Sequence, residues 1–299
     1  MLNDKYDAMR TAFDLAFRAA FEGRPAPTYE QYAMTVGDAA HTMVELPFLE
    51  QFAHMQKWLG ARQIKTFDGK KIRMTEDSYE DTVGIHTRAI ESDNWGMYTP
   101  AIQQMAVAAQ ALWDELCSEA ILNPKAWIDG KAFFAEDRKY DKSVIKNKTT
   151  EPLSHASFKD AWTTMQSYCG HKEKSLGVQP DTLMVGPALE FKARVILENQ
   201  FEIDDTGKVT VENGCKGLAK LVINRNFVGK YANHWRLMSC EGVIKPIALQ
   251  KSKETGLVSK NKPTDEGVFM EDMAIFGTAA YGSAAAAFPH LVYGGIVAG

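Results

Sequence analysis

The sequence predicts an α+β fold in which helices and strands occupy separate stretches of the chain. A polar β segment at 62–87 leads into one long amphipathic helix that ends at Asn123. Alternating helices and strands occupy 157–240, and strands return from about Ile244. Such segregated runs are typical of α+β proteins. Their order predicts an elongated unit with a compact α/β unit inserted between its two halves.

Composition sets broad limits on function. The chain has 299 residues, of which 45% are hydrophobic and 24% charged, enough for a substantial core. Its net charge of −4 is unlike that of most sequence-reading DNA-binding proteins, which are basic. The four cysteines lack Cys-x-x-Cys spacing, which predicts buried thiols in a reducing compartment. The sequence shows neither a signal peptide nor a run of 18 apolar residues, so no membrane span is expected.

The N-terminal residues 4–22 predict an amphipathic helix. Its apolar side chains recur every three or four residues, at Tyr6, Met9, Phe13, Phe17 and Phe21. Gly23 and two prolines end the helix. Two interpretations follow: the helix packs on its own core, or it lies as an arm on a neighbouring subunit.

The polar segment at 62–87 predicts a β ribbon. Asp68-Gly69 favours a tight turn, because glycine accepts positive φ without steric cost. Paired across that turn, one face carries Gln63, Lys65, Phe67, Lys70, Ile72 and Met74, and the other carries Ile64, Thr66, Lys71 and Arg73. Neither face is cleanly apolar, and an isolated two-stranded ribbon is marginal. A neighbouring copy is therefore expected to cover the ribbon. A turn at Thr75–Ser78 is an alternative position for its tip.

The long helix is predicted from Thr99, a capping residue, with Pro100 in its first turn. Its apolar stripe consists of Ile102, Met105, Ala106, Ala109, Leu112, Trp113 and Leu116. About 23 residues make a rod of roughly 34 Å. The apolar face of this rod has to cover a sheet or another layer.

Residues 124–153 read as a loop, and the compact α/β unit follows. Ser157 with Asp160 resembles a capping box, which starts a helix that Gly170 closes. The further predicted elements are a strand at Thr182–Val185, a helix at Pro187–Glu198, an exposed hairpin or loop at 202–218, and strands at Lys220–Ile223 and Trp235–Cys240. The late strand candidates are Ile247–Leu249, Leu257–Val258, Val268–Met270 and Ala274–Phe276.

No motif with catalytic spacing is found in the sequence. The seven histidines include no i, i+4 pair of the metalloprotease type, and neither a nucleophile elbow nor a phosphate-binding loop is present. The acidic pairs at 76–77 and 80–81 are interpreted as solvated or paired with basic partners. No catalytic residue, cofactor site or metal site is predicted, and the protein is not expected to be an enzyme.

Lys70 and Lys71 lie beside the Asp68-Gly69 turn. One interpretation is that they keep an exposed edge soluble and unpaired. The alternative is contact with an acidic patch on a neighbouring subunit, or a covalent crosslink to it.

The order of several short motifs resembles that of Mu-type phage major head subunits. An entry formed by Trp58, Leu59, Gly60, Arg62 and Ile64 precedes a second group at Tyr79, Glu80, Thr82, Val83, Ile85, Asp93, Gly96, Tyr98 and Pro100. Downstream follow Asp129-Gly130, Phe133-Phe134, Lys245-Pro246, Val268-Phe269-Met270, Phe276-Gly277 and Tyr281-Gly282. Each motif is weakly specific, and their shared order over most of the chain carries the resemblance.

The resemblance implies the Hong Kong 97-type phage major capsid protein fold. Residues 1–56 would contain the N-terminal arm and entry segment, and 57–92 the extended β-hairpin loop that lies over the adjacent subunit. The peripheral domain with its long spine helix would occupy 93–153, with return strands at 241–299. The axial domain would occupy 154–240.

The resemblance also implies function and partners. The chain is expected to be a major capsid protein that self-assembles into hexamers and pentamers of an icosahedral head enclosing double-stranded DNA. Other expected partners are scaffolding protein, portal and a decoration protein, with no membrane; the expected location is the virion, after assembly in the bacterial host cytoplasm. The axial segment Phe201–Gly217 is expected to make contacts. The contact residues expected in the extended loop are Lys65, Phe67, Asp68, Gly69, Lys70, Lys71, Arg73, Glu76 and Asp77.

Three alternatives remain at this point. A cargo-holding, encapsulin-like nanocompartment or gene-transfer particle would share the fold and differ in what it encloses. A tail or tube component would form rings or tubes. A metabolic α/β enzyme built on 154–240 would stay a monomer or small dimer at every concentration.

Overall fold

The computed structural model describes residues 2–23, 25–37, 42–47, 71–92, 94–140, 143–170, 174–203, 210–253, 256–262 and 265–297. The α-helices are α1 (Leu2–Glu22), α2 (Thr87–Glu91), α3 (Thr99–Leu122), α4 (His155–Gln166), α5 (Glu190–Glu198) and α6 (Glu266–Glu271). Short 3-10 helices are η1 (Thr28–Gln31), η2 (Trp95–Tyr98), η4 (Pro187–Leu189), η5 (Gly229–Tyr231) and η6 (Pro289–Leu291).

The strands fall into an early and a late group along the chain. The early strands are β1 (Ala33–Val36), β2 (Met43–Pro47), β3 (Lys71–Thr75), β4 (Asp77–His86), β5 (Arg138–Tyr140), β6 (Ser143–Ile145), β7 (Lys148–Thr149) and β8 (Thr182–Val185). The later strands are β9 (Phe201–Ile203), β10 (Thr210–Glu212), β11 (Lys220–Ile223), β12 (Trp235–Met238), β13 (Ile247–Lys253), β14 (Val258–Lys260), β15 (Met273–Ala286) and β16 (Val292–Gly295).

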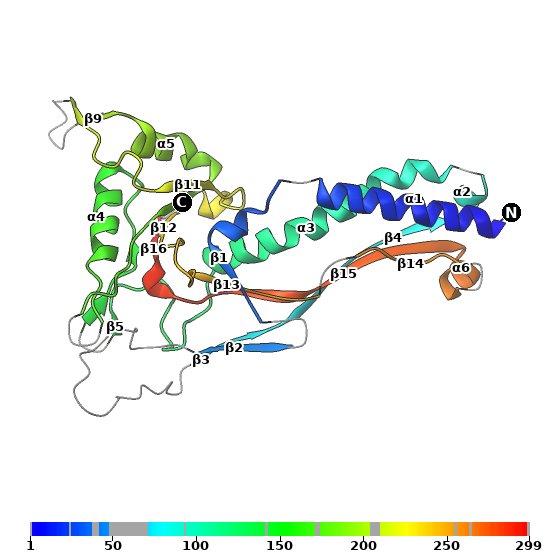
Figure 1. The fold of residues 1–299 in the computed structure, drawn as a ribbon, viewed down its shortest axis with the longest axis horizontal. Helices are drawn as coiled ribbons and strands as arrows, with labels where there is room; N and C mark the ends of the chain where they lie inside the picture. Colours follow the sequence, from blue (N-terminus) through cyan, green and yellow to red (C-terminus); the bar gives the residue numbers. More distant parts are fainter. Residues whose placement is uncertain are drawn as a thin grey trace.

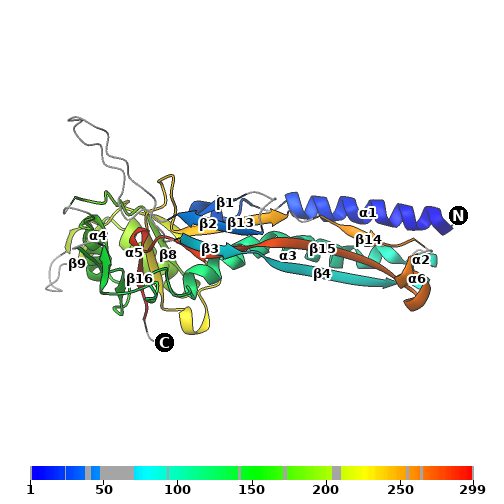
Figure 2. The ribbon, with the colours of Figure 1, turned by 90° about the horizontal axis from the view of Figure 1, so that it is seen from below.

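The chain forms a compact part and an elongated part that projects from it (Figure 1). The compact part contains α4, α5 and the sheet built around β8 and β12, and the elongated part contains α1, α3, β4, β14 and β15. Figure 2 shows the elongated part from below, with β4 and β15 in front of α3. Helices α1 and α3 therefore lie on one side of the long strands. The helices form one layer of the elongated part and the strands form the other.

The sheet of the elongated part is organised by β15. One edge of β15 pairs antiparallel with β4 over its length, from Met273 opposite His86 to Gly282 opposite Asp77. Its other edge pairs with β14 and then with β13, which in turn pairs in parallel with β1. The length of β15 lets it pair with β4 on one edge and with β14 and β13 in turn on the other. The predicted strand Ala274–Phe276 is the first quarter of this element.

Helix α1 packs on its own chain. Its buried face consists of Tyr6, Met9, Phe13 and Phe17, which join side chains of α3 and β15 in one hydrophobic cluster. The ring of Phe13 meets the edges of Trp95 and Phe276, with centroids 5.7 and 5.1 Å away. Full burial of an aromatic side chain stabilises a fold by roughly 1.5–3 kcal/mol. The interpretation in which the helix belongs to its own core is confirmed.

Helix α3 takes part in both hydrophobic cores of the molecule. Ile102, Met105 and Ala106 lie in the cluster with α1, whereas Cys117 and Ile121 lie in the cluster of the compact part. The predicted stripe is confirmed, with Leu112 and Leu116 partly buried. Tyr98 is the N-cap, one residue before the predicted Thr99, and Pro100 occupies the first turn. One rod thus connects the two parts of the molecule.

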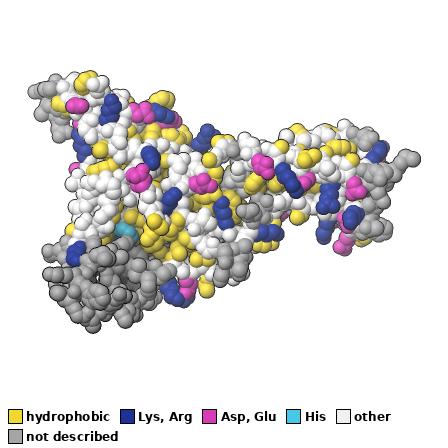
Figure 3. Space-filling model, in the orientation of Figure 1, with side chains coloured by type: hydrophobic (Ala, Val, Ile, Leu, Met, Phe, Trp, Pro, Cys, Tyr) yellow, Lys and Arg dark blue, Asp and Glu magenta, His cyan; other side chains and the backbone are white. Residues whose placement is uncertain are grey.

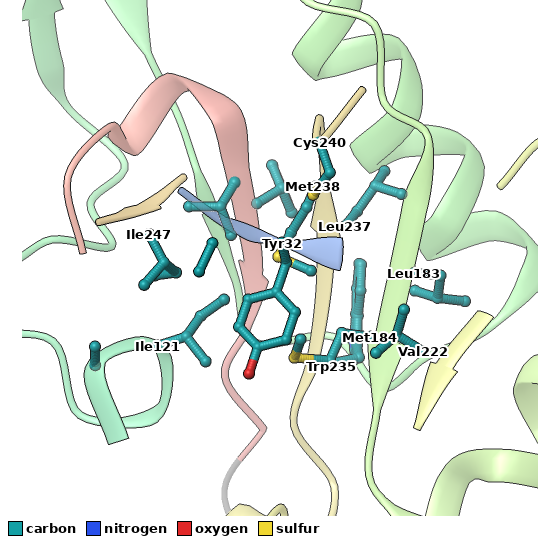
Figure 4. Close-up of a cluster of buried hydrophobic side chains, with 14 of the residues drawn as sticks. Tyr32, Ile121, Leu183, Met184, Val222, Trp235, Leu237, Met238, Cys240 and Ile247 are labelled. Atoms are coloured by element: carbon teal, nitrogen blue, oxygen red, sulfur yellow. The ribbon is translucent and has the colours of Figure 1, made fainter. Parts of the chain in front are cut away.

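The compact part is built on a mixed sheet with the strand order β11-β8-β12-β16-β7. All four residues of β8 and of β12 are buried, so both faces of the central strands are covered. Figure 4 shows the core beside them, with Tyr32 lying among Ile121 of α3, Met184 of β8 and Met238 of β12. The residues that lead into β1 therefore enter the core of the compact part.

The last strand crosses from one part to the other. After β15 the chain turns through η6, and β16 then pairs antiparallel with β12 and in parallel with β7. Gly295 packs flat on the ring of Trp235, where a Cβ atom would lie 2.0 Å from Nε1. The segment 241–299, expected to return to the elongated unit, therefore supplies strands to both sheets.

The start of α4 differs from the prediction. Ser154 is the N-cap: its hydroxyl accepts from the Ser157 amide at 3.1 Å, and the Ser157 hydroxyl accepts from the Ser154 amide at 2.8 Å. The predicted Ser157–Asp160 capping box is wrong because Ser157 is the third residue of the helix and not its cap. The helix also ends earlier, at Gln166, and the Gly170 amide instead donates to the Lys174 carbonyl at 2.8 Å.

The predicted strand Val268–Met270 is wrong, because these residues lie in α6. Before this helix, the Lys262 amide donates to the Asp265 carboxylate at 2.8 Å. Asp272, between α6 and β15, adopts a φ of 56°, and its carbonyl accepts from the Thr87 amide at 3.0 Å. A run of three apolar residues is too short for its period to separate helix from strand.

A buried arginine joins α3 to the compact sheet. Arg236 of β12 is fully buried, and its Nη1 donates to the carbonyls of Trp235 at 3.0 Å and Gly295 at 3.1 Å. Its Nη2 lies 3.5 Å from the carbonyl of Ile121, in the last turn of α3. The guanidinium also lies over the ring of Phe134, 4.6 Å from the centroid. Burial lowers the pKa of Arg236 to about 9, so it stays charged at neutral pH.

We expect Arg236→Ala to lower the free energy of unfolding by about 3 kcal/mol or more, because it leaves buried carbonyls without their donor and opens a cavity. Arg236→Lys should recover only part of this, since an ammonium cannot reproduce the planar fork. Urea denaturation of the unassembled chain, followed by tryptophan fluorescence, measures both. Arg194→Ala on the exposed face of α5 is the control and should leave stability nearly unchanged. Equal losses for Arg194→Ala and Arg236→Ala would contradict a joint at Arg236.

Candidate functional site

The structure describes the second part of the predicted contact segment in the extended loop, from Lys71 onward. Lys71, Arg73, Glu76 and Asp77 lie within the described residues. Lys65, Phe67, Asp68, Gly69 and Lys70 lie outside them, so the tip at Asp68-Gly69 stays a prediction. The described part of the segment is its base, formed by β2, β3 and the start of β4.

The base of the ribbon is formed by β2 and β3. They pair antiparallel, with Ile72 opposite Leu46 and Met74 opposite Val44. The sequence analysis did not predict residues 43–47 as a partner. The alternative tip at Thr75–Ser78 is wrong, because β3 and β4 do not pair and only Glu76 separates them. The reason is that β4 pairs instead with β15, so the chain continues straight from one sheet into the next.

One face of β3 is apolar and is covered by its own chain. Ile72 and Met74 are 6% and 3% exposed, while the alternate residues Lys71 and Arg73 point outward. The two apolar side chains belong to the same hydrophobic cluster as the compact part. The expectation that a neighbouring copy supplies the missing apolar surface is wrong for this stretch, because β2 and the body of the same subunit supply it.

The outer face of the ribbon holds a small ion-pair network. The Glu45 carboxylate accepts from Lys71 Nζ at 2.5 Å and from Arg73 Nε at 2.9 Å. The hydrogen bond from Lys71 holds the pKa of Glu45 below its usual value. Pairs as exposed as these stabilise only weakly and are screened by salt. Lys71 is thus engaged within its own ribbon.

Glu76 and Asp77 connect the ribbon to an acidic strand edge. The Glu76 amide donates to the Thr42 carbonyl at 3.1 Å, and Asp77 starts β4 opposite Gly282. Farther along β4, Glu80 and Asp81 are exposed. Within the described residues no strand pairs with the outer edge of β4. Charged residues on such an edge hinder uncontrolled strand addition, so pairing with another copy there requires a matching partner.

A second candidate surface lies on the compact part. Phe191 and Val195 of α5 are 80% and 44% exposed and lie one turn apart, on the side opposite the buried Ile196 and Leu197. Phe201, which opens the predicted segment Phe201–Gly217, is also 56% exposed. Single exposed apolar residues are ordinary, but apolar patches on one helix face indicate contact sites. On the face drawn in Figure 3, hydrophobic side chains and charges of both signs are spread over the compact and the elongated part.

The sequence analysis missed Phe191 and Val195. The helical pattern of this segment points inward at Leu189, Ala193, Ile196 and Leu197; the last three are buried and Leu189 is partly buried. The available signal was that Phe191 and Val195 are spaced i, i+4 but lie off the inward stripe. A large aromatic residue on the polar side of a short helix departs from the amphipathic pattern and indicates a candidate contact surface.

A shallow groove runs between α3 and the long strands. Its volume is about 310 Å³, and it is lined by Ala108, Ala109 and Leu112 of α3, by Ala279 and Ala280 of β15, and by residues 79–81 of β4. Among the described residues, no group of three or more His, Cys, Asp or Glu side chains is placed to hold a metal ion. No described helix is both long and apolar enough to cross a membrane. The edge of β4 and the exposed face of α5 are thus the candidate surfaces for contact with other macromolecules.

Comparison with protein families gives a match over nearly the whole chain. The model of the Mu-like prophage major head subunit gpT matches residues 6–151, 144–228 and 224–296. The chain is 21% identical over 272 residues to the major capsid protein of Escherichia phage Mu, covering 90% of this chain and 66% of that protein. It is 22% identical over 281 residues to the Mu-like prophage FluMu major head subunit of Haemophilus influenzae, covering 93% and 69%. The chain thus spans about two thirds of the length of these relatives.

Solved structures resemble the fold. The capsid of bacteriophage JBD30 superposes with a TM-score of 0.54 at 18% identity, covering 91% of this chain and 65% of that one. The JBD30 procapsid gives 0.52 at 22% identity, with 96% and 74% coverage. The mature capsid of bacteriophage PhiM1 gives 0.53 at 8% identity, with 91% and 87% coverage. The predicted fold class is confirmed.

We expect Ile72→Ala to lower the free energy of unfolding by about 2–4 kcal/mol, as for other buried large-to-small changes. Arg73→Ala, the adjacent residue on the exposed face, should leave it almost unchanged. Chemical denaturation of the unassembled chain compares the two. Similar small effects of both changes would mean that the apolar face of β3 is not covered within the subunit, and would restore the expectation that a neighbour covers it.

Proposed function

The chain belongs to the Mu-like prophage major head subunit family, and from this we propose that it is the major capsid protein of a tailed phage head. It self-assembles into hexamers and pentamers of an icosahedral shell that encloses double-stranded DNA. The observation that carries the proposal is the family match across the compact and elongated parts together. A match confined to one part would be compatible with a shared domain in an unrelated protein.

The two parts of the molecule take the two roles of a shell subunit in this proposal. The compact part is the axial domain, placed around five-fold and six-fold axes, and the elongated part is the peripheral domain with α3 as its spine. Residues 57–92 form the extended loop that reaches the adjacent subunit. Three contributions from outside 154–240 support the axial sheet and the core beside it: β7, β16 and the end of α3.

The proposed mechanism is assembly by repeated contacts between unlike surfaces. Such heterologous contacts form closed rings when the rotation between subunits closes, and a shell combines rings of two sizes. The exposed face of α5 and the acidic edge of β4 are the described surfaces that fit this role, one on each part.

The remaining partners follow from the same role. A subunit with a net charge of −4 encloses DNA without reading its sequence and does not depend on a dedicated basic surface. Scaffolding protein, portal and a decoration protein are proposed as assembly partners. The shell is proposed to assemble in the cytoplasm of the bacterial host and to function in the virion. The role in the shell is structural and requires no catalytic site.

We expect the purified protein to form closed shells, seen by negative-stain electron microscopy together with free hexamers and pentamers. Particles recovered from phage-producing cells should contain double-stranded DNA. Shells that contain an enzyme in place of DNA would instead support a nanocompartment. A protein that remains a monomer or small dimer at every concentration would overturn the proposal.

We expect Phe191→Asp to reduce the yield of closed shells at least several-fold, because a carboxylate on the exposed face of α5 opposes burial between subunits. The unfolding free energy of the unassembled chain should change by no more than about 0.5 kcal/mol, since the side chain is exposed. Sedimentation and electron microscopy measure assembly. Phe191→Leu, which keeps the site apolar, is the matched control and should assemble. Normal shells from Phe191→Asp would exclude this face from the contacts.

A further inference from the structure

The groove between α3 and the long strands is bounded by small side chains. Ala108 and Ala109 of α3 line one side, and Ala280 of β15 lines the other. Where a helix packs closely on a sheet, larger side chains interdigitate and fill the space between the two layers. Alanine side chains are too short to do this, so a space with apolar walls remains between the layers.

A buried hydroxyl without a partner belongs to the lining of this groove. Thr278 lies on the face of β15 that packs against α3, because it alternates with the buried Phe276 and Ala280. It is only 5% exposed, and its Oγ1 makes no hydrogen bond to any described residue. A buried polar atom that lacks a partner is unfavourable. A ligand that brings a donor to this point therefore gains a hydrogen bond without displacing an existing one.

Two carboxylates lie toward opposite ends of the groove. Asp81 is directly opposite Thr278 in the pairing of β4 with β15, so both side chains lie on the same face of the sheet. Farther along β15, Gly282 packs against Trp113, where a Cβ atom would lie 2.7 Å from the indole ring. Because α3 and β15 run in the same direction (Figure 1), Glu115 lies beyond this contact, at the far end from Asp81.

The charge of the groove is not balanced by its own lining. None of the described residues that line it is a lysine, arginine or histidine. Asp81 and Glu115 are exposed, and neither makes an ion pair with another described residue. The third acidic residue of the lining, Glu80, accepts from the Thr82 hydroxyl at 2.6 Å on the other face of β4 and is not counted here. The groove thus combines apolar walls with an unpaired negative charge toward each end.

We propose that this groove binds a linear aliphatic polyamine, with its methylene chain along the alanine walls and its ammonium groups at Asp81 and Glu115. The ammonium at Asp81 also donates to Thr278 Oγ1, since an ammonium carries three N–H donors. The methylene groups are removed from water against Ala108, Ala109 and Ala280. A metal ion does not fit this arrangement, because it needs oxygen ligands that converge on one point.

A lysine side chain of a second copy offers the same chemistry in part, since it also has a methylene chain and an ammonium group. It has only one ammonium, however, and so pairs with one carboxylate and leaves the other without a partner. A polyamine pairs with both, and for this reason it is the occupant that the groove favours. The proposal does not rest on the proposed function, because every group it uses belongs to one subunit.

Isothermal titration calorimetry of the unassembled full-length chain with spermidine, at low ionic strength, tests the proposal. One spermidine should bind per chain, and 1-aminobutane, which carries a single ammonium, should bind at least several-fold more weakly. Asp81→Asn combined with Glu115→Gln should weaken spermidine binding by about five- to thirtyfold, the range for the loss of two partly exposed ion pairs. Equal affinity for spermidine and 1-aminobutane would overturn the proposal.

Two further variants separate the groove from general surface charge. Glu119→Gln combined with Glu212→Gln is the matched control: it changes the net charge equally, at exposed carboxylates outside the groove, and should weaken binding no more than about twofold. Ala108→Leu keeps both groove carboxylates but fills part of the space, and should weaken binding several-fold. Circular dichroism establishes that each variant is folded, and Ala108→Leu remains an independent test if the Asp81 and Glu115 variant is not.

Two results would overturn the proposal. Equal weakening by the groove variant and by its matched control, or unchanged binding to Ala108→Leu, would mean that spermidine associates with surface charge alone. A spermidine affinity that falls as the protein concentration rises would mean that a basic side chain of a second copy occupies the groove instead.

Discussion

The contact of Arg236 with the end of α3 fixes how the two parts of the molecule are joined. Since α3 lies in both hydrophobic cores, its direction at the joint also sets the direction of α1 and of the long strands. One guanidinium reaches carbonyls of α3, β12 and β16 at this point. The C-terminus of a helix favours a cation, and a planar set of donors can hold three segments in one relative position.

Arg236 fixes the relative position of the two parts, but burying its charge is unfavourable. Within the described residues Arg236 makes no ion pair with a carboxylate, and its charge is compensated by carbonyl dipoles and by the faces of Phe134 and Phe227. Buried charges are usually paired, and apolar replacements of similar volume are often as stable. An apolar residue at 236, however, would provide no donor to the carbonyls, and α3 would then be held against the sheet mainly by side-chain packing, such as that of Cys117 and Ile121. The charged guanidinium of Arg236 therefore contributes more to the relative position of α3, β12 and β16 than to the stability of the fold.

Elements with a strong local pattern were predictable from the sequence, and long-range pairings were not. The spacing of apolar residues and the flanking Thr-Pro and Asn-Pro placed α3 within one residue, and the run Thr182–Val185 placed β8. The pairing of β2 with β3 and of β16 with β12 leaves no local signature, because it depends on which segments the tertiary fold brings together. Arg236 was also unpredictable: an arginine in a short strand suggests a solvent-facing position, and only a strand covered on both faces buries it.

The candidate surfaces were also predictable only where they depend on a local sequence pattern. The alternation in β3 was visible, but the sequence alone did not reveal that its apolar face is buried within the subunit. That burial changes the energetics of association, because the base of the ribbon is ordered before it meets a neighbour and less entropy is lost on contact. In the proposed shell, the favourable energy between copies comes from surfaces that stay exposed, for which Phe191 and Val195 are the proposed example. A few modest contacts of this kind, repeated around closed rings, allow incorrect arrangements to dissociate before the shell closes.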